Sequence, residues 1–193
     1  MKLSPLLFLA IILMPVASSM AQDFPVSTTA RQDAAAYLKP LNKRGVVRLK
    51  TIAGDFATNQ VASIGKYSGN RITVIGRISH LSQGQSENKV LVVTLQDAGA
   101  SLPAVKAEFL PGSIPENSSI QISQDGSTAN LIRRDRTGNI LGSSPYLSVD
   151  QTVGIKGDYK EVRVGDIVLT ACKLIPKERL HELRNDLNKS SPQ

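Results

Sequence analysis

The stretch Arg71-Ile-Thr-Val-Ile-Gly-Arg-Ile-Ser79 decides the fold. Ile72, Val74 and Ile78 recur at every second position, and this period of two predicts a β-strand with one face toward a core. Gly76 lies in the same row and predicts a bend or a bulge in that strand. Four further segments have the composition of strands, namely 89–95, 104–110, 152–159 and 166–174. The sequence therefore predicts a mainly β protein with five strands.

The segment between the third and fourth predicted strands, residues 111–150, is long for a plain loop. Asp125-Gly126 and Gly138-Asn139 lie between apolar residues there, and such dipeptides are hairpin signals. We therefore expect a β-hairpin insertion of two or three strands.

Helices are predicted on both sides of the five strands. Residues 27–39 and 51–66 have helical patterns, with Thr51 as the expected N-cap of the second helix. A C-terminal helix is predicted from Pro176, because leucines from Leu180 onward recur at intervals of three and four. The expected organisation is a signal peptide over 1–21, an N-terminal helix and basic linker over 22–50, a strand domain over 51–174 that includes the insertion, and a C-terminal helix and tail over 175–193.

The first 21 residues have the three parts of a secretory signal peptide. Lys2 supplies the positive start, an apolar run extends over 6–14, and small residues end at Ala21. We expect cleavage after Ala21 and a periplasmic or secreted mature protein. An uncleaved membrane anchor is the alternative, but Pro15 interrupts the run, which is shorter than the roughly 20 residues that span a bilayer. No cysteine lies directly after the run, so a lipid anchor is not supported.

The composition excludes several classes of protein. The chain has 193 residues, 41% of them hydrophobic, and a formal net charge of +7, which fits a folded domain with a basic surface. Its one cysteine, Cys172, cannot form an internal disulfide, and two histidines do not suggest a zinc site. The motifs of common hydrolases, metalloproteases and nucleotide-binding enzymes are missing. We therefore expect no cofactor, no metal and no catalytic residue, and we interpret Cys172 as a buried thiol.

Four short motifs carry a more specific resemblance. They are Asn59-x-x-Ala62, Lys66-Tyr67-x-Gly69-x-x-Ile72-x-Val74-x-Gly76, Val153-x-Ile155-Lys156-Gly157 and the run Ile167-Val-Leu-Thr-Ala-Cys-Lys-Leu174. Over 51–174 the chain resembles the tRNA-anticodon-like family of bacterial OB-fold proteins, whose members are mostly secreted or envelope proteins without an established activity. The resemblance implies a five-stranded Greek-key barrel. The chain departs from the family in its long 111–150 segment and in lacking a strand-three cysteine that could face Cys172.

Basic side chains on or beside the strands and the insertion, together with one aromatic, are candidates for ligand binding. They are Arg77, Lys106, Arg133, Arg134, Arg136 and Tyr159. We expect an exported, non-catalytic binding or interaction module for an unidentified anionic ligand or an envelope protein partner. Two alternatives stay open: a single-stranded nucleic-acid or tRNA-binding OB protein, and an enzyme-accessory domain. OB-folds that bind single strands add stacking aromatics to a basic groove, and aromatics are few here.

Overall fold

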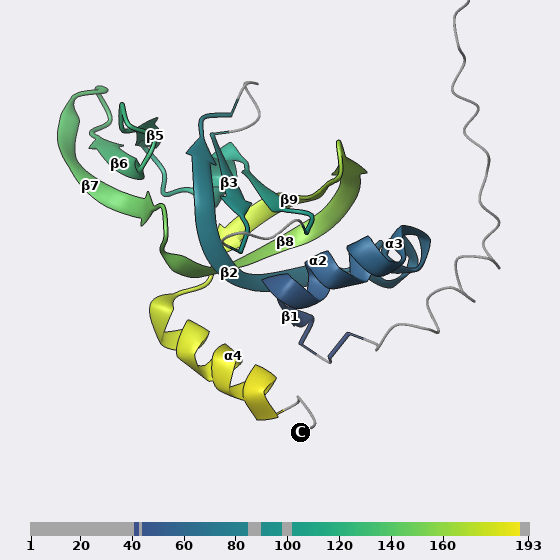
Figure 1. The fold of residues 1–193 in the computed structure, drawn as a ribbon. Helices are drawn as coiled ribbons and strands as arrows, with labels where there is room; N and C mark the ends of the chain where they lie inside the picture. The colour runs from purple at the N-terminus through teal and green to yellow at the C-terminus, as the bar shows by residue number, and fades with distance from the viewer. Residues whose placement is uncertain (1–40, 43, 85–89, 98–101, 190–193) are drawn as a thin grey trace, which may run out of the picture.

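The computed structural model describes residues 41–42, 44–84, 90–97 and 102–189. The predicted signal peptide and the predicted helix over 27–39 lie outside the described residues. Figure 1 shows a barrel from which a small sheet and a C-terminal helix project. In chain order the elements are β1 (Val46–Arg48), α2 (Leu49–Thr58), α3 (Gln60–Tyr67), β2 (Arg71–Ser82), β3 (Leu91–Leu95), β4 (Val105–Phe109), the short 3-10 helix η1 (Pro111–Ser113), β5 (Ser118–Ile122), β6 (Thr128–Arg134), β7 (Ile140–Ser148), β8 (Thr152–Arg163), β9 (Asp166–Leu174) and α4 (Lys177–Lys189).

Five strands close into a barrel. Neighbouring strands follow the order β2-β3-β4-β9-β8, and β8 pairs again with β2. The pairs are antiparallel except for β4 and β9, which are parallel. This arrangement confirms the predicted OB-fold-like Greek-key barrel. The fourth barrel strand is longer than the predicted 152–159, because β8 continues to Arg163 before a two-residue turn.

Strand β2 belongs to both halves of the barrel. Its residues 71–77 pair with β8, and residues from Ile78 onward pair with β3. A β-bulge between Ile78 and His80 marks the change of partner. Gly76 lies just before this change, and a Cβ added there would be 2.9 Å from Leu49 Cδ2. Because Gly76 has no side chain, Leu49, the first residue of α2, can pack directly against this part of β2.

Alternate residues of the barrel strands form one apolar core. Val105, Ala107 and Phe109 are fully buried, as the period of two predicts for β4. Cys172 lies in the same core, and its burial raises the pKa of the thiol to about 12. The second face of β2 is also covered, because α4 packs against Ile75.

The helix predicted over 51–66 is two helices, α2 and α3, that meet at Asn59. Asn59 has an extended backbone with φ of −153°, and its Oδ1 accepts a hydrogen bond from the Ala62 backbone N–H at 3.0 Å. The Asn59-x-x-Ala62 motif is therefore the N-cap of α3. The prediction of Thr51 as the N-cap of the preceding helix is wrong, because α2 begins at Leu49 with Arg48 in the cap position.

Stacked aromatic rings join α2 to α3 and to strand β8 of the barrel, and an ion pair joins the two helices to each other. The Phe56 ring stacks between Tyr67 and Tyr159, with centroids 5.6 and 5.8 Å away. Asp55 Oδ2 accepts hydrogen bonds from the Tyr67 hydroxyl at 2.6 Å and from Lys66 Nζ at 2.7 Å. Burial and the hydrogen bond to Asp55 raise the pKa of Tyr67 well above its ordinary value.

The insertion over 111–150 forms the three-stranded sheet β5-β6-β7, at the upper limit of the predicted two or three strands. Ile120, Leu131 and Leu147 from this sheet are buried in the same core cluster as the barrel residues. The sheet is therefore joined to the barrel by apolar packing, and β7 is its outermost strand in Figure 1.

The ends of the described chain lie against each other. The predicted basic linker contains the short strand β1, which pairs in parallel with β2 and was not predicted. Leu180 of the predicted C-terminal helix packs with Val46 of β1, and Arg44 forms an ion pair with Asp186.

Candidate ligand-binding groove

The outer face of the barrel over β3, β4 and β9 carries side chains in register. His80 on β2 lies opposite Thr94 on β3, which lies opposite Lys106 on β4. Lys106 in turn lies opposite Val168 on β9. A second row consists of Ser82, Val92 and Glu108. Side chains opposite each other in neighbouring strands lie on the same face, so the two rows form one continuous surface.

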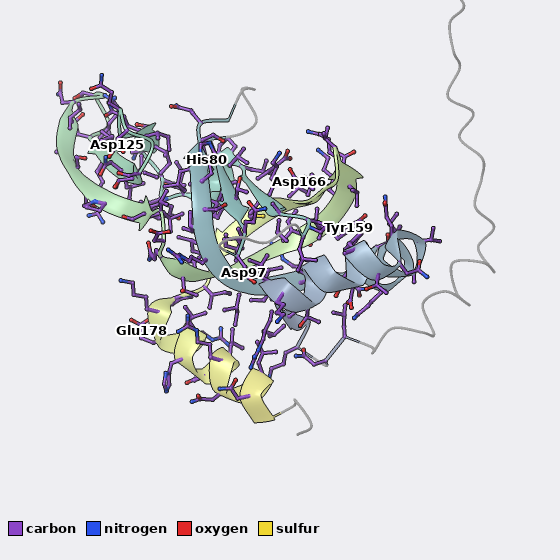
Figure 2. The ribbon with its side chains drawn as sticks, in the orientation of Figure 1. His80, Asp97, Asp125, Tyr159, Asp166 and Glu178 are labelled. Carbon is purple, nitrogen blue, oxygen red and sulfur yellow. The ribbon has the colours of Figure 1, made fainter. Side chains whose placement is uncertain are left out.

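These rows form the floor of a groove of about 460 Å³. Its walls are the start of the β2–β3 connection at Gln83 and the β8–β9 hairpin at Arg163 and Val164. Figure 2 labels His80 near the end of β2 and Asp166 at the start of β9. We call this surface the β3–β4 groove, and its described lining residues are His80, Ser82, Gln83, Val92, Thr94, Lys106, Glu108, Arg163, Val164 and Val168.

The long basic side chains at the groove lie beside carboxylates. Lys106 Nζ is 2.7 Å from Asp166 Oδ2. Glu108 is only 4% exposed, and its carboxylate is 3.6 Å from Lys160 Nζ and 3.8 Å from Arg163 Nη1. Burial of a carboxylate is costly unless opposite charges lie close to it. The two cations of the β8–β9 hairpin therefore compensate the buried charge in the floor of the groove.

The described part of the groove is close to neutral. Arg163 also pairs with Glu161, so three basic side chains at the groove and its rim meet three acidic ones. Among the described lining residues there is no aromatic side chain. Both features differ from a single-strand binding groove, which combines unpaired cations with stacking rings.

The hairpin at the rim of the groove has a strained turn. Val164 and Gly165 have φ of 51° and 83°, the left-handed values of a two-residue type I′ turn. Glycine adopts such values without cost, whereas a β-branched residue rarely does. Val164 is also 96% exposed. The strained residue thus carries an apolar side chain that is exposed to solvent beside the groove. Backbone strain of this kind clusters at functional sites.

The arrangement of strands and groove agrees with the comparison to known families. The family described as tRNA_anti-like matches residues 1–173. The chain belongs to this family. In OB-folds generally, the face of the second and third barrel strands and the connections beside it bind oligonucleotides or oligosaccharides. In this tRNA_anti-like protein those strands are β3 and β4, so the β3–β4 groove occupies that face.

One solved structure to which the chain is similar comes from Klebsiella pneumoniae subsp. pneumoniae MGH 78578 and is described as a "putative nucleic acid-binding lipoprotein". It is 15% identical, with a TM-score of 0.44, and the similarity covers 75% of this chain and 97% of that one. No curated protein matches this tRNA_anti-like chain.

The six residues that the sequence suggests for ligand binding lie in separate places. Lys106 lies in the β3–β4 groove. Arg77 does not line the groove, and its Nη2 is 2.7 Å from Asp150 Oδ1. Tyr159 stacks on Phe56 of α2, and Figure 2 labels it near the helices. The remaining three, Arg133, Arg134 and Arg136, lie together on β6 and the turn that follows it.

Sequence reasoning missed Glu108, Arg163 and Val164 as groove residues. The alternation in β4 contained part of the signal, because Lys106 and Glu108 alternate with the core residues and must share the outer face. The position of the β8–β9 hairpin over that face depends on strand pairing, which the local pattern does not contain.

The described residues contain neither a cluster of metal ligands nor a long apolar helix. They contain no group of three or more histidine, cysteine, aspartate or glutamate side chains that could hold a metal ion. No helix within the described ranges combines the length and apolar character needed to cross a bilayer.

Proposed function

We propose that this protein is an exported, non-catalytic binding module that holds a segment of an envelope protein partner in the β3–β4 groove. The observation that carries the proposal is that the described surface of the groove is close to neutral, has its cations in ion pairs and contains no aromatic side chain. A polypeptide needs neither unpaired cations nor stacking rings, whereas single-stranded nucleic acid relies on both.

The mixture of side chains in the groove supports a protein ligand. Val92 and Val168 supply apolar floor, and Ser82 and Thr94 supply neutral hydrogen-bonding groups. Protein interfaces have this composition, with an apolar centre and a polar rim. Val164 adds an exposed apolar contact at the rim, where a partner would cover it.

Single-stranded nucleic acid is the second candidate. Two observations favour it: the family description refers to tRNA, and the chain has a net charge of +7. Phosphate contacts release counterions, so affinity for a single strand would fall with salt by about 0.7 log units per contact for each tenfold rise in salt concentration.

Site-specific photocrosslinking in cells tests the groove directly. A photoreactive benzoylphenylalanine replaces Val164, and the control carries it at Val61, which is 42% exposed on α3 away from the groove. We expect a protein adduct of defined mass from position 164 and none from position 61. Thr94→Arg places a long side chain in the groove and should abolish the adduct, whereas Thr58→Arg on α2 should not.

Two results would contradict a protein ligand. The first is an adduct at position 164 that nuclease removes, together with oligonucleotide binding whose salt slope is about −2 or steeper, equivalent to three or more phosphate contacts. The second is equal crosslinking at positions 164 and 61, which would show that the groove is not a binding surface.

A further inference from the structure

A second surface of unusual composition lies at the β6–β7 hairpin. Arg133 and Arg134 end β6, Arg136 lies in the turn, and Ile140 and Leu141 begin β7. Ile140 is 63% exposed and Leu141 is 70% exposed, which makes them two of the four large hydrophobic residues that are exposed in the described chain. We call these five residues the arginine tip.

Strand register brings the charged and apolar side chains of the tip together. Arg134 lies opposite Ile140, and Arg133 lies opposite Gly142. Leu141 is therefore the extra residue of a β-bulge, which redirects the edge of the sheet locally. The two aliphatic residues and the arginines thus share one end of the β5-β6-β7 sheet, and Figure 1 shows that this sheet projects from the barrel.

The turn of the tip is held in place by its own hydrogen bonds. Asp135 Oδ1 accepts hydrogen bonds from the Thr137 and Asn139 backbone N–H groups, both at 2.9 Å, and from the Thr137 hydroxyl at 2.7 Å. Asp135 Oδ2 accepts another from Asn139 Nδ2 at 3.1 Å. The one carboxylate among the arginines is therefore used within the turn. The tip keeps its shape without a ligand and presents three cations against one anion.

The charge of the tip is not neutralised as it is in the β3–β4 groove. Within the described ranges, Arg133 and Arg136 form no ion pair, and Arg134 donates from Nη1 to the Gly138 carbonyl oxygen at 3.0 Å. The two surfaces of the protein therefore differ in electrostatics and point to different kinds of ligand.

We propose that the arginine tip docks the protein on a bilayer that contains anionic phospholipid. Headgroup phosphates would contact the three arginines, and Ile140 and Leu141 would enter the boundary between headgroups and acyl chains. Basic side chains beside exposed aliphatic ones are the combination that binds anionic interfaces. A soluble anion would use the arginines and leave the aliphatic side chains in water. The β3–β4 groove has no lining residue from β5, β6 or β7, so it stays accessible in this arrangement.

Vesicle sedimentation tests the proposal with protein recovered after expression from the full-length gene. The vesicles contain about 30% phosphatidylglycerol in phosphatidylcholine, or phosphatidylcholine alone, because the negative surface potential supplies the attraction. Each arginine near such a surface contributes about fivefold in partition, so Arg133→Gln with Arg136→Gln should weaken binding about 25-fold. The matched control, Lys156→Gln with Lys173→Gln, removes the same charge from an exposed site on β8 and β9 and should leave partition within about threefold of the unmodified protein.

A second pair of variants tests the aliphatic contact. Ile140→Ser with Leu141→Ser should weaken binding severalfold, whereas Val61→Ser should not. Binding that survives these serine changes intact would overturn the proposal in favour of a purely anionic ligand. Equal partition into both vesicle types, or equal loss in the lysine control, would also overturn it. Displacement from vesicles by a single-stranded oligonucleotide at equal phosphate concentration would instead assign the tip to nucleic acid and refute membrane docking.

Discussion

Gly157→Ala is expected to destabilise the barrel through one close contact. Gly157 on β8 faces the bulged part of β9, where Lys156 pairs with Lys173 but Asp158 already pairs with Thr170. A Cβ at position 157 would lie 2.6 Å from Cys172 Sγ, 3.1 Å from the Thr170 carbonyl oxygen and 3.3 Å from a Leu169 side-chain atom. Real Cβ atoms are not found at the first of these distances, so the Cys172 side chain or the β9 backbone beside it would have to shift.

The size of the effect follows from two opposing contributions. Overpacking a closely packed core costs about 1 to 3 kcal/mol. The value should be near the upper end here, because one of the crowded atoms belongs to the backbone. Replacing glycine by alanine also lowers the entropy of the unfolded chain, which returns about 0.4 to 1 kcal/mol. We expect a net loss of about 2 kcal/mol, which lowers Tm by about 4 to 8 °C in a domain of this size.

Urea denaturation followed by circular dichroism measures this loss, and a double-mutant cycle identifies its cause. In a Cys172→Ala background the nearest atom is gone, so Gly157→Ala should cost less than half as much, with a coupling of about 1 kcal/mol. Gly54→Ala is the control, because nothing lies within 4 Å of a Cβ there and alanine should stabilise α2 by about 0.5 to 1 kcal/mol. A Gly157→Ala protein as stable as the parent, or a cost that Cys172→Ala leaves unchanged, would refute the packing argument.

Three other changes follow from the described contacts. Val164→Asn should raise the free energy of unfolding by about 1 kcal/mol, because asparagine tolerates a left-handed backbone that valine does not; an unchanged midpoint in urea would show that the turn is not strained. Asp55→Ala should cost about 3 kcal/mol, since it leaves the largely buried ammonium of Lys66 without its carboxylate, and a loss below 1 kcal/mol in the same assay would contradict that contribution. Hydrogen bonds from Thr137 and Asn139 lower the pKa of Asp135 from 3.8 to about 2. The contribution of Asp135 to stability is therefore complete above about pH 4 and is lost as the pH falls toward 2. Asp135→Asn should flatten the dependence of Tm on pH in that window, and a Tm that still falls as steeply below pH 4 would argue against this contribution.

The barrel strands could be predicted from the sequence because each has one face in the core. Val105, Ala107 and Phe109 are a clear instance, and the same alternation places Lys106 on the outside. Strand β1 could not be predicted in this way, since its three residues are too few to display a period. The break between α2 and α3 was missed although Asn59 is a strong N-cap residue, because the apolar spacing continues across it.

The candidate groove could be predicted only in part, for a different physical reason. A strand pattern gives the face on which Glu108 lies, but it does not give the neighbours that cover that face. Arg163 and Val164 reach the groove through a hairpin whose position depends on pairing with β9 and β2. Such long-range register is a property of the closed barrel and is absent from any local window of sequence.

The closure of the barrel through β9 has a consequence for the order in which the chain folds. The strands of the projecting sheet pair only with sequence neighbours, whereas β2 must find β8 and β4 must find β9 across the whole insertion. Pairings between distant segments form slowly, because closing the long loop lowers the chain entropy before any stabilising contact has formed. The projecting sheet can therefore be complete while the barrel is still open. A chain that emerges N-terminus first leaves β4 without its parallel neighbour until the last strand, β9, has appeared.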